Sequence, residues 1–115
     1  MLTGKHNRAG EPTPGTRFTL GTTAERYQER YWHDREFNTV GVLHTVADAA
    51  GVSLTTLAIA WVLANPIITA PIIGASRLEQ LADNLKALNF KLDDSLKQKL
   101  DDLTTEYRRA MQCAN

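Results

Sequence analysis

The feature that most constrains the fold is a short apolar run, residues 67–73, which lies between Pro66 and Gly74. It is rich in isoleucine and does not alternate with polar residues, which is typical of a strand buried on both faces of a parallel sheet. Such a strand needs partners, because its backbone N–H and C=O groups must be hydrogen-bonded. The chain offers no second strong strand. It is therefore either a largely helical domain in which this run is an extended loop, or the end of an α/β fold whose other strands are missing.

Helical patterns account for most of the remaining chain. Helices are predicted within 21–66, with candidate caps at Thr22, Asp34, Gly51 and Ser53. A further helix is expected over 76–89 and a last one over 93–111. The apolar stripes at helical spacing consist of Phe37, Val40, Leu43 and Ala47; of Leu54, Leu57, Ala58 and Trp61; of Leu78, Leu81, Leu85 and Leu88; and of Leu96, Leu100, Leu103 and Tyr107.

Composition excludes several classes of protein. The 115 residues include 13 Lys and Arg and 13 Asp and Glu, so a net charge of zero gives no electrostatic basis for binding nucleic acid or an anionic membrane. The most apolar stretch, 57–75, is interrupted by Asn65, Pro66 and Pro71, which argues against a transmembrane helix. The single cysteine, Cys113, allows no internal disulfide, and the histidines lack the spacing of metal ligands. With no apolar leader at the N-terminus, we expect a cytoplasmic protein without a metal site.

The segment 71–84 joins the apolar run to a helix start. A strand that leads through small residues into a helix presents free N–H groups and the positive end of the helix dipole, and both attract phosphate. Ser76 offers a hydroxyl, and Arg77 offers a guanidinium that binds phosphate by paired hydrogen bonds. Ser76 and Glu79 also fit a capping box, which needs no ligand. The spacing alone therefore fits a phosphate site or an ordinary capped helix.

This segment, Pro-Ile-Ile-Gly-Ala-Ser-Arg-Leu-Glu-Gln-Leu-Ala-Asp-Asn, resembles the last strand–turn–helix unit of the aldo-keto reductases. The likeness covers essentially the whole chain. Residues 2–5, Leu-Thr-Gly-Lys, resemble the turn after the seventh barrel strand of the family, and residues 10–18 resemble the Gly/Pro-rich loop that follows. Arg30-Tyr31-Trp32 and Gly51-Val52-Ser53 are similar to segments of bacterial members and of potassium-channel β subunits.

The resemblance implies an α/β fold, namely the C-terminal fragment of a (β/α)8 barrel, mostly α-helical with one or two short strands. The chain 1–115 is then one partial domain. Residues 1–20 form a loop that covers the cofactor, residues 67–74 form the last barrel strand, and the helices are those predicted above.

The resemblance also implies NADP(H) as cofactor. In the family, the matching helix start contacts the 2′-phosphate and the adenine, and the loop after strand seven covers the pyrophosphate. Many members have Lys-Ser in the turn where this chain has Gly-Ala, so Arg77 carries more of the phosphate contact here. The positions assigned to the cofactor are Ser76, Arg77, Gln80, Asp83, Asn84, Gly74, Ala75, Lys5 and Arg17.

No catalytic residue is expected in this chain. Aldo-keto reductases protonate the carbonyl with a Tyr, helped by a Lys, an Asp and usually a His, all from the first half of the barrel, and nothing in this sequence matches those motifs. The chain alone is therefore expected to be inactive. Its uncovered apolar stripes predict self-association or union with a complementing barrel fragment. The alternatives are a non-enzymatic helical module that oligomerises or regulates a partner, and a truncated remnant.

Overall fold

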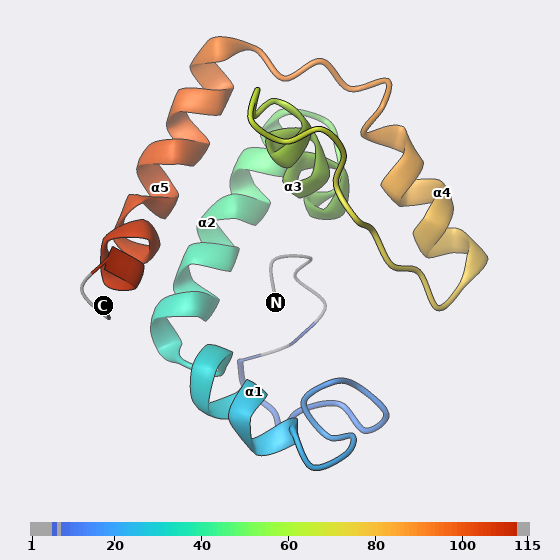
Figure 1. The fold of residues 1–115 in the computed structure, drawn as a ribbon, viewed down its shortest axis with the longest axis vertical. Coiled ribbons are helices and arrows are strands. Elements are labelled where there is room, and N and C mark those ends of the chain that lie inside the picture. The colour runs from blue at the N-terminus through green and yellow to red at the C-terminus, as the bar shows by residue number, and fades with distance from the viewer. Residues whose placement is uncertain (1–5, 7, 113–115) are drawn as a thin grey trace.

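A computed structural model describes residue 6 and residues 8–112, and of residues 108–112 it gives only the backbone. The described residues form α-helices and no β-strand. The helices are α1 (Ala24–Tyr31), α2 (Asp34–Ala49), α3 (Leu54–Leu63), α4 (Leu78–Lys86) and α5 (Asp94–Gln112). α2 packs on α5 and on α3, and α4 packs on α3 (Figure 1).

The hydrophobic core lies between α2, α3 and α5. The stripes predicted on these helices supply most of it. Leu57 of α3 is only 1% exposed. Phe90 and Leu92, from the segment between α4 and α5, pack against the same core. The core residues are Val40, Leu43, Val46, Ala47, Leu54, Leu57 and Leu100.

Local capping fixes where α3 begins. Ser53 is its N-cap, and the Ser53 hydroxyl accepts a hydrogen bond from the N–H of Thr56 at 3.1 Å, as the sequence predicts. Gly51 has φ +70°, a left-handed conformation that glycine adopts at no steric cost, which confirms the predicted turn after α2. The cap predicted at Thr22 is wrong, because α1 starts one residue later, after Thr23, without a side-chain cap.

The N-terminal loop is held against α1 and α2 by aromatic rings. The rings of His6 and Phe18 lie edge to face at 4.8 Å, and Phe18 contacts Trp32 at 5.1 Å. Trp32 in turn meets Phe37 of α2 at 5.0 Å. The side-chain amide of Gln28 donates a hydrogen bond to the C=O of Phe18 at 2.7 Å. These contacts place the described part of the loop beside α1 and the start of α2.

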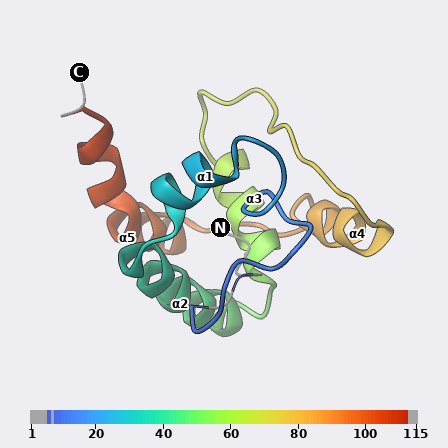
Figure 2. The ribbon, with the colours of Figure 1, turned by 90° about the horizontal axis from the view of Figure 1, so that it is seen from below.

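The strand predicted at 67–74 is not formed. The segment runs as an extended arm along the outside of the molecule from α3 to α4 (Figure 2). A strand exists only as part of a ladder, and no described residue supplies a neighbouring strand. The N–H groups of Ile67 and Ile68 instead bond to the side chain and the C=O of Asn65, which closes a turn. In this chain the segment is therefore an extended loop, and the prediction of one or two short strands is wrong for the described residues.

The apolar stripe predicted on α4 is also uncovered. Leu78 is 77% exposed and Leu88 is 70% exposed. α4 packs on α3 through its opposite side, where Asn84 and the adjoining Ala87 are buried. No described element lies over the leucine side, so the stripe faces solvent together with the isoleucines of the arm.

Neither a membrane-spanning helix nor a metal cluster is found among the described residues. No single helix there has both the length and the hydropathy of a membrane span. α2 and α3 reach these values only as a pair, and they are bent by 90° at the break between them. No group of three or more His, Cys, Asp or Glu in the described part of the chain is arranged to hold a metal ion.

Truncation of the most buried core leucine tests this packing. Leu57→Ala leaves a cavity between α2, α3 and α5, and we expect it to lower the free energy of unfolding by about 2–5 kcal/mol. Leu88→Ala, at an exposed position, removes the same atoms and is expected to change it by less than about 0.5 kcal/mol. Urea titration followed by circular dichroism measures both values. Equal effects of the two variants would contradict the described core.

Candidate functional site: the turn before α4

The candidate site is the turn that leads the extended arm into α4. Arg77 is the N-cap residue of α4, and no side chain caps the helix there. The first N–H groups of the helix therefore have no capping acceptor among the described residues, and they lie at the positive end of the helix dipole. Because α4 starts at Leu78, Ser76 lies outside the helix and the capping box predicted for Ser76 and Glu79 is wrong. Gln80 reaches back instead, and its Oε1 accepts from the Ser76 N–H at 2.9 Å and from the Ser76 hydroxyl at 3.1 Å.

Ser76, Arg77 and Gln80 are thus brought together on one exposed helix start. The guanidinium of Arg77 forms no hydrogen bond or ion pair with another described residue. A guanidinium beside free N–H groups has the donors that an oxyanion requires. The acidic side chain of Glu79 lies in the same first turn and opposes an anion there, so Arg77 is needed to make the local charge favourable.

Asn84 and Gly74 connect the turn to the body of α4. Asn84 is buried, and its side-chain amide donates a hydrogen bond to the C=O of Gly74 at 3.2 Å. This bond ties the inner side of α4 to the residues that precede it. Asn84 therefore holds the turn from the buried side of α4, whereas Gly74 and Ala75 lie at the exposed surface of the turn.

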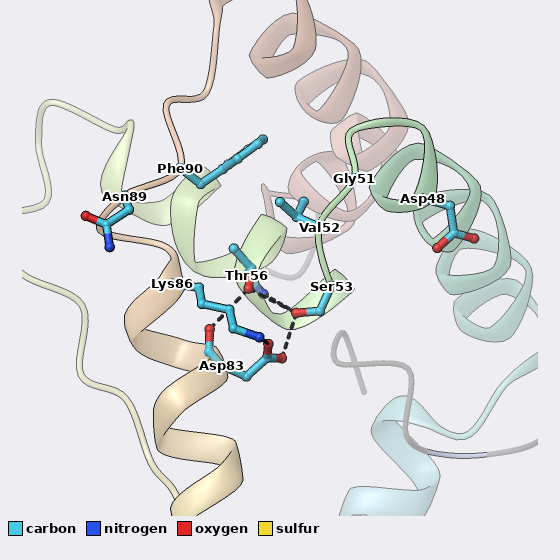
Figure 3. A pocket seen from close by; sticks show the side chains of 9 residues that line it. All are labelled: Asp48, Gly51, Val52, Ser53, Thr56, Asp83, Lys86, Asn89 and Phe90. Carbon is cyan, nitrogen blue, oxygen red and sulfur yellow. Dashed lines mark hydrogen bonds and ion pairs between the residues drawn. The ribbon is translucent and has the colours of Figure 1, made fainter.

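Asp83 points away from the turn, toward α3 (Figure 3). Its carboxylate accepts a hydrogen bond from the Ser53 hydroxyl at 2.6 Å and pairs with Lys86 at 3.2 Å. The hydroxyl of Thr56 donates to the C=O of Asp83 at 3.1 Å. The structure thus joins Asp83 to the start of α3 and not to Ser76 or Arg77.

Of the two residues predicted in the N-terminal loop, the described one, Arg17, is not brought to the turn. The guanidinium of Arg17 lies over the ring of Tyr27 on α1, 5.4 Å from its centre. Lys5 lies outside the described residues. The roles proposed for Lys5 and Arg17 at the cofactor stay predictions.

An open cavity of about 520 Å³ lies beside Asp83, between the α2–α3 turn and α4. Ser53, Asp83 and Lys86 form its polar wall, and Val52 and Phe90 contribute apolar surface (Figure 3). Sequence reasoning missed it because its main contact joins residues 30 positions apart, for which no local motif exists. The hydroxyls of Ser53 and Thr56 are hydrogen-bonded to the Asp83 side chain and backbone, so the cluster holds α3 to α4.

The Ser53 hydrogen bond, and then Lys86, hold the pKa of the Asp83 carboxyl below its ordinary value of 3.8, while partial burial acts in the opposite direction. A lowered pKa means that the ionised carboxylate is the form that stabilises the fold. Protonation of Asp83 at acid pH is therefore expected to weaken the contact between α3 and α4.

Comparison with known proteins decides the family. The model of the aldo/keto reductase family matches residues 1–105. The chain belongs to the aldo-keto reductase family. The fold of this family is the (β/α)8 barrel. The described part of this member contains helices, turns and loops, and no β-strand.

Relatives of this aldo-keto reductase chain are much longer than the chain itself. A candidate voltage-gated potassium channel subunit beta of Schizosaccharomyces pombe is 32% identical over 117 residues, which cover 95% of this chain and 34% of that protein. A similar subunit of Arabidopsis thaliana is 38% identical over 92 residues, 77% of this chain and 26% of that protein. L-glyceraldehyde 3-phosphate reductase of Escherichia coli is 32% identical over 89 residues, 77% of this chain and 25% of that enzyme. The chain thus spans about a third of these relatives or less.

The acid-side role of Asp83 has a direct test. Its stabilising effect is present above the ordinary pKa of 3.8 and is lost as the pH falls through the lowered value. We therefore expect the difference in unfolding free energy between the wild-type chain and Asp83→Asn to shrink as the pH falls from about 5 to about 3. Asp48→Asn, at an exposed carboxylate of the same cavity, serves as the control for the loss of one negative charge there. A difference in unfolding free energy that stays constant over this pH range would show that the ionised Asp83 carboxylate does not stabilise the fold.

Proposed function

We propose that this chain is the C-terminal NADP(H)-binding portion of an aldo-keto reductase-like oxidoreductase of the cytoplasm, whose complete reaction is NADPH-dependent carbonyl reduction. The observation that carries the proposal is the uncapped start of α4, where Arg77 and Ser76 are exposed beside free N–H groups. Family membership supports it, since the relatives include proteins named as oxidoreductase and as reductase. The single cysteine suits a reducing compartment.

The described donors suit the adenosine 2′-phosphate of NADPH. The N–H groups of the first turn and the Arg77 guanidinium supply charge-assisted hydrogen bonds to phosphate oxygens. The Ser76 hydroxyl exchanges its bond to Gln80 for one to the phosphate, while the Ser76 N–H keeps its bond to the Gln80 Oε1. NADH has no 2′-phosphate, so the same donors make the site selective for NADPH.

Bound NADPH would supply the hydride, and a proton donor is still required for the carbonyl oxygen. The candidate turn contains no Tyr or His, and the carboxylate of Asp83 is bonded toward α3. We therefore propose that this chain holds the adenosine end of the cofactor, and that the catalytic residues belong to a part of the barrel outside this chain. The chain by itself is then an inactive, single partial domain.

A second candidate is a non-enzymatic helical module that oligomerises or joins a partner. The exposed isoleucines of the arm and the exposed leucines of α4 favour it, because an apolar surface of this kind is stabilised by burial against another surface. Relatives described as candidate potassium channel β subunits favour it as well. In this reading the chain self-associates or completes itself with a complementing barrel fragment.

Titration of the purified chain with NADPH distinguishes the two candidates. We expect saturable binding by calorimetry that is weaker for NADH. Arg77→Ala should raise the Kd for NADPH by about ten- to a hundred-fold, since a hydrogen bond to a charged group contributes about 1.5–3 kcal/mol. It should leave the Kd for NADH nearly unchanged.

Arg26→Ala is the matched control, because Arg26 is an exposed arginine on α1. It should bind NADPH as the wild-type chain does. Equal affinity for NADPH and NADH, or an Arg77→Ala variant with the wild-type Kd for NADPH, would contradict a 2′-phosphate site at Arg77. A folded chain that binds neither nucleotide would favour the interaction module.

A further inference from the structure

We infer that the extended arm is a dimerisation strand, in which residues 68–72 pair antiparallel with the same residues of a second copy of this chain around a two-fold axis at Ala70. The inference deepens the self-association proposed above and rests on it, and it is independent of NADP(H) binding. Three properties of the arm carry it: unpaired backbone groups, a nearly symmetric sequence, and a proline that disables one edge.

The backbone of the arm is available for pairing. The N–H groups of Thr69, Ala70 and Ile72 bond to no described residue. The side chain of Ile72 is fully exposed. No charged residue lies between Asn65 and Arg77, so the arm lacks the charged side chains that commonly prevent edge pairing. The chain as a whole has a net charge of zero, so long-range repulsion between copies is weak.

Both ends of the arm are anchored. At one end the Ile68 N–H donates a hydrogen bond to the C=O of Asn65. At the other end the Asn84 side-chain amide donates one to the C=O of Gly74. The residues between them are thereby presented away from the body of the molecule (Figure 2). The arm bends at Thr69 in the single chain, and pairing requires this bend to straighten.

The sequence of the arm is nearly the same in both directions. Residues 67–73 are Ile-Ile-Thr-Ala-Pro-Ile-Ile, with Ala70 at the centre. In an antiparallel pair centred there, Ile68 lies opposite Ile72 of the second copy, and the small side chains of Ala70 meet on the axis. Cross-strand pairs of β-branched residues stabilise a sheet, and a two-fold axis is the commonest symmetry of protein dimers.

Pro71 determines which edge pairs. Successive residues of a strand direct their N–H and C=O groups to opposite edges, so Ile68, Ala70 and Ile72 share one edge, and Pro71 lies on the other. Pro71 has no N–H and weakens its own edge. On the edge opposite Pro71, each Ala70 N–H donates to the Ala70 C=O of the other copy, and each Ile72 N–H donates to the C=O of Ile68. The Ile68 N–H on that edge keeps its bond to the C=O of Asn65. The proline edge then faces outward and hinders a third strand, which favours a dimer over an open fibre.

A pair of proline substitutions tests the edge. Ala70→Pro removes the N–H on the axis, and Thr69→Pro removes an N–H on the outward edge; both residues are exposed in the arm. By sedimentation equilibrium we expect the wild-type chain and Thr69→Pro to form dimers, and Ala70→Pro to raise the dimer dissociation constant at least about ten-fold. Circular dichroism checks that all three chains keep their helices.

A cysteine pair tests the register in the Cys113→Ser background. Opposed residues of a hydrogen-bonded antiparallel pair have Cα atoms about 5.5 Å apart, which lies within the range of a disulfide. Ala70→Cys should form a dimer disulfide on mild oxidation, while Thr69→Cys, which lies opposite Pro71 of the second copy, should form it much more slowly.

Three results would overturn the inference: a wild-type chain that stays monomeric up to about 100 μM while binding NADPH, equal dissociation constants for Ala70→Pro and Thr69→Pro, or faster oxidation of Thr69→Cys than of Ala70→Cys. A chain that stays monomeric alone and binds only a separately expressed barrel fragment would contradict self-pairing and would make that fragment the partner of the arm. Because Arg77 lies outside the paired residues, loss of NADPH binding in Arg77→Ala with an unchanged dimer concerns the cofactor proposal alone.

Discussion

Helix α3 is the element on which the rest of the structure depends, because it is buried on two sides by different kinds of contact. Leu57 faces the apolar core shared with α2 and α5, whereas Thr56, also only 1% exposed, donates its hydroxyl hydrogen bond to the backbone of α4. Ser53 caps the helix and holds the Asp83 carboxylate with the same oxygen. The apolar side stabilises the three-helix core, and the polar side fixes where α4 lies relative to it.

The orientation of the candidate cofactor turn follows from this arrangement. No described element covers the leucine side of α4, so its position depends on the contacts of Asp83 with α3, on buried Ala87 and on the Asn84–Gly74 bond. Those contacts lie behind the helix start and leave Ser76 and Arg77 open to solvent. Asp83, which the resemblance assigns to the adenine, is in this structure a residue that holds two helices together. The adenine contact remains a proposal that requires the Ser53 bond to be exchanged.

The sequence predicted the buried stripes of α2, α3 and α5 correctly, whereas it wrongly predicted burial for the arm and for the leucines of α4. The periodic stripes of α2, α3 and α5 face one another, so their spacing predicted the core correctly. The isoleucine run at 67–73 and the stripe around Leu81 have the pattern of buried elements, yet both are exposed. The chain spans about a third of the length of its relative from Schizosaccharomyces pombe, and no described residue buries these two segments. The bond between Ser53 and Asp83 had no local motif, since it joins residues 30 positions apart.

The arm and the cofactor turn are adjacent but need not compete. Strand pairing at 68–72 uses backbone groups on one edge, whereas an oxyanion at α4 uses N–H groups beyond Ser76, and Gly74 separates the two. The bond from Asn84 to the C=O of Gly74 holds the end of the arm whether or not the arm is paired. A second copy therefore covers isoleucines without covering Arg77, and the same short segment can serve association and anion binding at once. In a closed barrel the arm would have strands on both edges, so the proposed self-pairing requires that no strand of the same chain occupies the Ala70 edge.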